Sequence, residues 1–135
     1  MSPEPGAFQQ QVEPLLAEVL ASANAHDTDR HMAAYARDPA LIFIIDGEII
    51  RGWEALRERQ RQWWNDGKAV GSYEYLGEPA YEALGKDLGL TTLLIAARAQ
   101  LPDGQLRSRR LAFSALWSRR QEGWRIVHAH ESSTG

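Results

Sequence analysis

From Ser72 to the C-terminus the chain carries no helical periodicity, and this constrains the fold more than any other feature. Four stretches rich in β-branched, aromatic and apolar residues are strand candidates: YEYLGEPAYEAL, LGLTTLLIAARAQL, QLRSRRLAFSALWSRR and GWRIVHAHES. The breaks between them, Gly85-Lys86-Asp87, Pro102-Asp103-Gly104 and Gln121-Glu122-Gly123, carry turn residues. Short turns predict an antiparallel meander, and Pro79 marks its first strand as an edge or a bulge.

The front of the chain is mainly helical. VEPLLAEVLASANAHD has apolar residues at helical spacing, and Pro14 fits the first turn of that helix. Asp27 predicts the N-cap of a second short helix over TDRHMAAYA, which must stop before Pro39. ALIFII, closed by Asp46-Gly47 and followed by EII, predicts a hairpin. WEALRERQRQWWNDG is amphipathic and predicts a third helix.

Helices followed by a long meander indicate an α+β fold, with three N-terminal helices packed on one face of a strongly curved antiparallel sheet. A chain of 135 residues forms one domain, 1–135, whose proline-containing start, residues 1–10, we expect to be flexible.

Composition excludes several classes of function. The chain has no cysteine, so it has neither disulfides nor zinc–thiolate sites. A formal charge of −3 gives no electrostatic case for nucleic acid. The longest apolar run, Ala40 to Ile45, is too short to cross a bilayer, and the first residues lack a signal-peptide pattern. We therefore expect a cytoplasmic protein with neither a nucleic-acid nor a membrane partner.

The order of elements and the ending W-x-I-x-H-x-H-x-S resemble the nuclear transport factor 2-like (cystatin-like cone) superfamily. WSRRQEGWRIVHAHESS is similar to SnoaL-like proteins and to the association (hub) domain of calcium/calmodulin-dependent kinases. YARDPALIFIIDGEIIRGWEALRE resembles a segment of ketosteroid isomerases. The resemblance implies a sheet wrapped into a cone with an interior pocket. This fold hosts isomerases, dehydratases, cyclases and plain binding modules, so it does not assign an activity.

Departures from these relatives are informative. The position of the isomerases' proton-abstracting aspartate is Phe43, which cannot accept a proton. The positions of the hub's carboxylate-binding arginines are Ala96, Ala115 and Glu131. The resemblance therefore transfers neither steroid-isomerase chemistry nor the hub's anion pocket to this chain.

Strand alternation places His128 and His130 on one face of the last strand and Glu131 on the other. The hub resemblance places Glu131 inside the cone. A carboxylate in an apolar pocket has its pKa raised, which suits acid–base catalysis, or it pairs with a cation, for which Arg98 is the candidate. A structural ion pair, or a solvated residue at a frayed strand end, remains the alternative.

Aromatic residues supply the expected pocket wall. The candidate ligand-binding residues besides Arg98 are Phe43, Trp53, Trp63, Phe113, Ala115 and Trp117, and Tyr35 joins Glu131 as a candidate catalytic residue. The same aromatic spacing also fits a plain core. The sequence thus predicts a small-molecule pocket with isomerase, dehydratase or cyclase chemistry, or alternatively a non-catalytic ligand-binding or oligomerisation domain.

The two histidines of the last strand supply at most half of a metal site, so we expect neither metal nor cofactor and interpret them as interface residues. The strand candidate at 88–101 is apolar on both faces, which indicates that a second subunit covers its outer side. We expect a homodimer through an outer face that carries Leu93, Ile95, Ala97, His128 and His130.

Overall fold

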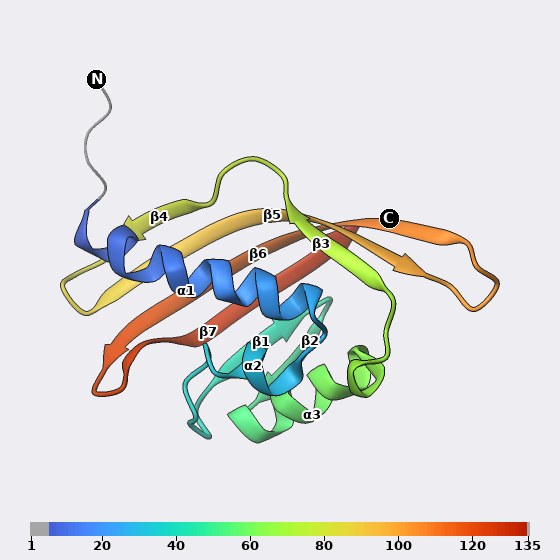
Figure 1. Ribbon diagram of the computed structural model, residues 1–135. Coiled ribbons are helices and arrows are strands. Elements are labelled where there is room, and N and C mark those ends of the chain that lie inside the picture. Colours follow the sequence, from blue (N-terminus) through green and yellow to red (C-terminus); the bar gives the residue numbers. More distant parts are fainter. Residues whose placement is uncertain (1–5, 135) are drawn as a thin grey trace.

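Three helices lie on one side of a large curved sheet in the computed structural model, which describes residues 6–134 (Figure 1). The helices are α1 (Ala7–Asn24), α2 (Thr28–Met32) and α3 (Trp53–Trp63), followed by a 3₁₀ turn, η1 (Asn65–Gly67). The strands are β1 (Ile42–Ile45), β2 (Glu48–Arg51), β3 (Gly71–Tyr75), β4 (Ala80–Ala83), β5 (Leu88–Gln100), β6 (Leu106–Arg120) and β7 (Gly123–Thr134). The α+β class is confirmed.

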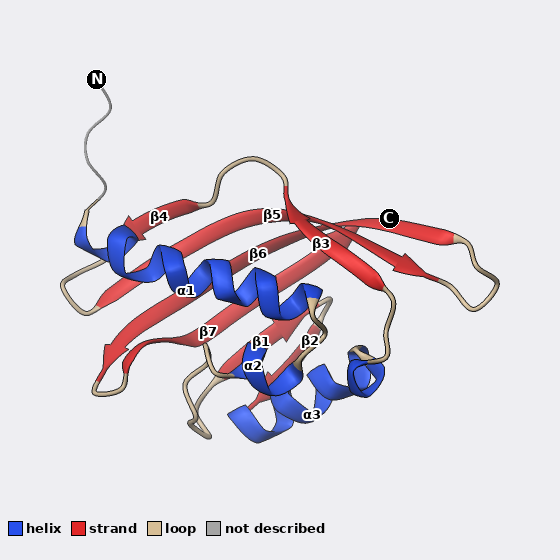
Figure 2. Cartoon of the chain, viewed as in Figure 1, coloured by secondary structure: helices blue, strands red, loops and turns tan. Residues whose placement is uncertain are grey.

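The strand order is β2-β1-β7-β6-β5-β3, with β4 also paired to β5 (Figure 2). The long strands β5, β6 and β7 form the predicted antiparallel meander. The sheet is nevertheless mixed, because β1 runs parallel to β7. The first strand candidate is divided: β3 ends at Tyr75, β4 begins at Ala80 after Pro79, and both pair with β5, which confirms the edge position.

The helix α1 starts earlier than the sequence predicts. It begins at Ala7 and carries Pro14 in its interior, because buried Phe8 anchors its first turn against Trp124, with ring centroids 5.2 Å apart. Residues 7–10 are therefore helical, and the expectation for residues 1–5 lies outside the described part of the chain. Asp27 caps α2 as predicted, accepting a hydrogen bond from Arg30 N at 3.1 Å. Within residues 6–134 no helix combines the length and hydropathy that crossing a membrane demands.

The hydrophobic core includes two indoles, Trp117 and Trp53, whose N–H groups both donate hydrogen bonds. Trp117 is fully buried and donates to Thr91 Oγ1 at 3.0 Å. Trp53 donates to the Met32 carbonyl at 3.1 Å. These hydrogen bonds matter because a buried N–H without an acceptor costs about 1–3 kcal/mol.

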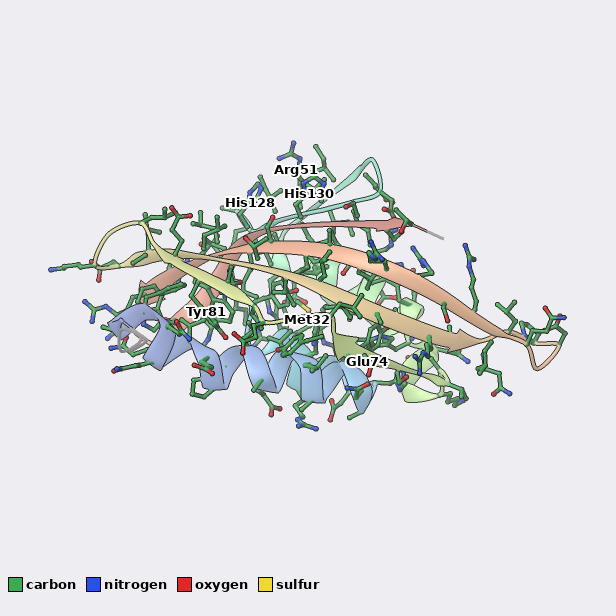
Figure 3. The ribbon with its side chains drawn as sticks, turned by 90° about the horizontal axis from the view of Figure 1, so that it is seen from above. Met32, Arg51, Glu74, Tyr81, His128 and His130 are labelled. Atoms are coloured by element: carbon green, nitrogen blue, oxygen red, sulfur yellow. The ribbon has the colours of Figure 1, made fainter. Side chains whose placement is uncertain are left out.

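The predicted outward set on β5, Leu93, Ile95 and Ala97, is wrong: these residues face the helices. Leu93 is 6% exposed, whereas its neighbour Leu94 is 42% exposed. Alternation alone could not choose between two apolar faces, and the register with β6 decides, since Leu93 lies opposite the buried Phe113. The outer face therefore carries Thr92, Leu94 and Ala96 together with His128 and His130, and Figure 3 shows the two histidines on the side of the sheet away from α1.

We predict that Gly89→Ala destabilises the fold by about 1–3 kcal/mol, since overpacking a close contact displaces neighbours. A Cβ at Gly89 would stand 2.2 Å from Cε1 of Phe8. Gly85→Ala is the matched control, because a Cβ there meets nothing within 4 Å. Denaturant unfolding measures both, and equal stability of the two variants would contradict the packing of α1 described above.

Candidate functional site

A cavity of about 390 Å³ lies between the helices and the inner face of the sheet. This volume is in the range of small-molecule sites. The second half of α1 forms one wall, and the inner residues of β5 and β6 form the opposite wall. The polar side chains that reach the cavity include His31, Tyr35, Gln60, Tyr73 and Glu131. An apolar hollow with a few polar groups is suited to orienting a small ligand.

Glu131 projects from β7 into this cavity. In the sheet it lies beside Ile45 of β1 and Phe113 of β6, both of which also line the cavity. Within residues 6–134, no hydrogen bond or ion pair reaches its carboxylate. Burial raises the pKa of Glu131 to about 7, the Asp46 carboxylate adds to the rise, and Arg109 opposes it. The group thus changes charge near neutral pH, as a general acid or base must.

Asp46 has a second role beyond its turn. It adopts φ 44° and Gly47 adopts φ 87°, the paired positive values of a type I′ hairpin. The Asp46 carboxylate also accepts hydrogen bonds from the backbone N and the Oγ of Ser133, both at 3.0 Å, and Arg109 lies 3.7 Å away. The hairpin is thereby tied to the end of β7, beside Glu131.

Arg98 is not the partner of Glu131 that the sequence suggested. It borders the cavity, but its guanidinium is largely exposed and forms an ion pair with Glu74 of β3 at 3.6 Å. The physical reason is that the inward and outward positions of β5 are the reverse of those predicted, so the Arg98 side chain points outward. Arg109 on β6 supplies the nearby positive charge instead, and it also donates to Ser133 Oγ.

Two tyrosine hydroxyls face the same cavity. The Tyr35 hydroxyl has no hydrogen-bond partner in the described part of the chain, and burial raises its pKa, with a further contribution from the Glu131 charge. The Tyr73 hydroxyl accepts a hydrogen bond from Trp64 Nε1 at 3.0 Å, which leaves its own proton free to donate. Burial also raises the Tyr73 pKa. Both groups therefore stay protonated donors at neutral pH.

The aromatic wall is smaller than the sequence suggested. The Phe43 ring lies 6.2 Å from Tyr35, 6.2 Å from Trp63 and 6.3 Å from Phe113, centroid to centroid, and all four rings line the cavity. Trp63 is 37% exposed and stands at its rim.

Three expected wall residues do not line the cavity, which corrects the sequence-based assignment. Ala115 and Trp117 are fully buried in the core, because the tight packing of the first half of α1 leaves no space beside them. Trp53 packs under Arg37, whose guanidinium carbon lies 4.3 Å from the ring centroid, in a separate surface depression.

Sequence reasoning missed Tyr73, His31 and Arg109 as cavity residues. Period-two alternation over 71–75 places Tyr73 and Tyr75 on one face, and helical spacing places His31 one turn before Tyr35. These signals were present but did not indicate which face would be hollow. In the described chain, no three His, Asp or Glu side chains are grouped to hold a metal ion.

Comparisons with known proteins agree with this fold. A family model described as a SnoaL-like domain matches residues 12–134. No curated protein is detectably similar. A nuclear transport factor 2-like protein of Salmonella enterica shares 22% identity, with 95% of this chain and 92% of that chain covered and a TM-score of 0.82.

Two further solved structures are similar. A ketosteroid isomerase-like protein of Erwinia carotovora has 14% identity, coverage of 97% and 99%, and a TM-score of 0.79. The association domain of C. elegans CaMKII has 20% identity, coverage of 93% and 95%, and a TM-score of 0.75. At these identities the likeness establishes the fold, including the expected cystatin-like cone, and leaves the activity open.

We predict that Glu131 makes the stability of the wild type pH-dependent. Because the folded pKa of Glu131, about 7, lies above its ordinary value of 4.5, its contribution to the free energy of unfolding is full below pH 4.5 and is lost as pH rises through 7. Relative to Glu131→Gln, the free energy of unfolding of the wild type should fall by up to about 3 kcal/mol between pH 4.5 and 8.5. Urea titrations measure this difference, with Glu82→Gln on exposed β4 as control; a pH-independent difference would place Glu131 in solvent.

Proposed function

The chain belongs to the SnoaL-like domain family, and we propose that it catalyses proton transfer on a small, largely apolar carbonyl compound bound in the cavity. The observation that carries this proposal is Glu131: a carboxyl group without a partner in the described chain, with a pKa of about 7, in a largely apolar hollow. Such a group accepts and returns a proton at neutral pH without a large cost in either direction.

The proposed reaction uses one base and one or two hydroxyl donors. The Glu131 carboxylate removes a proton from the carbon next to the carbonyl, and the C–H electron pair moves to the carbonyl oxygen as the enolate forms. The hydroxyls of Tyr35 and Tyr73 donate hydrogen bonds to that oxygen, where negative charge develops. Glu131 then returns the proton to the same or a conjugated carbon, which gives exchange or isomerisation.

The environment supports these roles. Phe43, Trp63 and Phe113 provide an apolar wall that holds the hydrocarbon part of the substrate. The raised pKa values of Tyr35 and Tyr73 keep both hydroxyls protonated when Glu131 is ionised. The resemblance of the fold to a ketosteroid isomerase-like protein is consistent with this chemistry, although the base here is at Glu131 and the strand position of Phe43 carries none.

The test uses solvent exchange, which does not require the natural substrate. Proton NMR of 2-tetralone in D₂O follows loss of the α-proton signal. We expect wild-type protein to accelerate exchange, with a rate that rises with pH through about 7, the Glu131 pKa. Glu131→Gln should lower the rate by about 10²–10⁴-fold, the usual contribution of a positioned base. Glu82→Gln on β4 should leave it unchanged.

Binding of 2-tetralone without any acceleration, in wild type and variant alike, would favour the alternative function, a non-catalytic ligand-binding or oligomerisation domain. The similarity to the CaMKII association domain favours assembly as a second property of this fold. A catalytic cavity and an assembly surface are compatible, because they lie on opposite faces of the sheet.

We propose that two copies of this chain pair through the outer sheet face. The apolar residues of this face are Ile42 and Ile44 of β1, Leu94 and Ala96 of β5, and Ala112 of β6. Leu94 and Ala112 lie directly opposite each other in the sheet. Leu94 is 42% exposed. In the described chain, residues of α1, α2 and α3 line the cavity on the inner side of the sheet, and Figure 3 shows α1 on the side away from the two histidines. A second copy is therefore the natural cover for this apolar outer surface.

Leu94→Lys should convert the dimer to a folded monomer, because it places a charge at the centre of the buried surface. Leu106→Lys is the control, since Leu106 is 72% exposed near the tip of the β5–β6 hairpin. Light scattering at micromolar concentration gives the mass. A monomeric wild type, or a Leu94→Lys protein that remains dimeric, would contradict this interface.

A further inference from the structure

His31 is a buried imidazole to which the proposed reaction assigns no role. It lies at the end of α2, is 7% exposed and contributes to the cavity wall. Its ring is held between two aromatic neighbours, with centroids 4.9 Å from Trp64 and 5.8 Å from Tyr35. A side chain this confined presents its ring nitrogens in defined directions.

One ring nitrogen is fully engaged on α1. His31 Nδ1 lies 3.1 Å from the Val19 carbonyl oxygen and 3.0 Å from Ser22 Oγ. The Ser22 hydroxyl in turn donates to the same Val19 carbonyl at 3.0 Å. These three contacts are satisfied together only if Nδ1 carries the proton, because an unprotonated Nδ1 would direct a lone pair at the Val19 carbonyl oxygen.

The protonation state of the other nitrogen follows. Burial lowers the His31 pKa to about 4, so the ring is neutral at physiological pH. A neutral ring with its proton on Nδ1 has an unprotonated Nε2, which is a hydrogen-bond acceptor only.

Nε2 is open to the cavity. No hydrogen bond from within residues 6–134 reaches it. In that part of the chain, every side-chain nitrogen or oxygen atom that is fully buried has a hydrogen-bond partner, so an atom without a partner is not fully buried. Nε2 must therefore border open space, and the open space that His31 lines is the cavity. Glu131 reaches the same cavity from β7, whereas His31 reaches it from the helical layer.

We propose that His31 Nε2 is a specificity determinant that accepts a hydrogen bond from a hydroxyl or N–H group of the ligand. The ligand class is then a small apolar compound with two polar features: a carbonyl beside Glu131 and the tyrosines, and a hydrogen-bond donor beside α2. The Ser22–Val19 pair acts as the positioning device that fixes the imidazole tautomer. The carbonyl of this ligand class rests on the proposed function, whereas the ligand's hydrogen-bond donor beside α2 does not.

The binding test uses a matched pair of probes. Indole carries an N–H donor and no conventional acceptor, and benzofuran has the same shape with an oxygen in place of that N–H. Isothermal titration calorimetry should show indole binding to the wild type roughly tenfold tighter than benzofuran, the value of one net hydrogen bond. In His31→Phe the ratio of the two dissociation constants should fall to about one.

Control variants separate His31 from the other acceptors of the cavity. Gln60→Leu and Glu131→Leu should keep the preference for indole, and His31→Gln, which restores an acceptor oxygen, should recover part of it. A ratio near one in the wild type, or a preference that survives His31→Phe, overturns the proposal. Circular dichroism melts verify that each variant is folded.

A second measurement needs no variant. Long-range ¹H–¹⁵N NMR of the wild type should show His31 Nδ1 as a protonated and Nε2 as an unprotonated nitrogen, and indole should shift the Nε2 resonance. The opposite tautomer overturns the proposal. Loss of ketone exchange in the wild type, with the indole preference intact, would remove the proposed catalysis and leave this site in place; the reverse pattern would remove only the His31 role.

Discussion

The cavity depends on how α1 packs against the sheet. At its N-terminal end the contact is as close as it can be, because the Phe8 ring occupies the space that a side chain at Gly89 would need. Farther along, Leu16, Val19 and Leu20 face the hollow instead of filling it. The far end of the helix is held by Asn24, which makes two hydrogen bonds with the backbone of Tyr73, at 2.9 and 2.7 Å. Because the helix is fixed at both ends and the sheet is curved, a space remains between the helix and the sheet.

That enclosed space determines the electrostatics of the site. Burial disfavours charge, so it raises the pKa of Glu131 and lowers that of His31. The two groups nevertheless differ in behaviour: His31 stays neutral down to about pH 4, whereas Glu131 titrates near 7. Burial is the largest influence on the pKa of Glu131, Asp46 adds to the rise, and Arg109 opposes it. One wall of the cavity thus carries an imidazole that is neutral at physiological pH, and the other carries a carboxyl group that titrates near pH 7.

The proposed ligand site and the proposed dimer surface lie on opposite faces of the sheet. The inner residues of β5, β6 and β7 surround the cavity, and the outer residues one position away form an apolar surface with the two histidines. A substitution on one of these strands therefore alters either the cavity or the outer apolar surface, according to the face on which its side chain lies. Leu93 and Leu94 are adjacent in sequence and serve different surfaces.

Several features could be predicted from the sequence because they depend on local chemistry. The turn residues after Ser72 determine the meander, Asp27 caps α2, and alternation in HAHES separates Glu131 from the two histidines. Other features required tertiary structure. On β5 both faces are apolar, so only the register with β6 decides that Leu93 is inside and Arg98 outside. Asp46 and Ser133 are 87 residues apart in the sequence. Asp46 approaches Ser133 and Glu131 only because β1 pairs in parallel with β7. The sequence alone thus determined which residues can carry a proton, and the long-range pairing of strands decided which of them meet in the cavity.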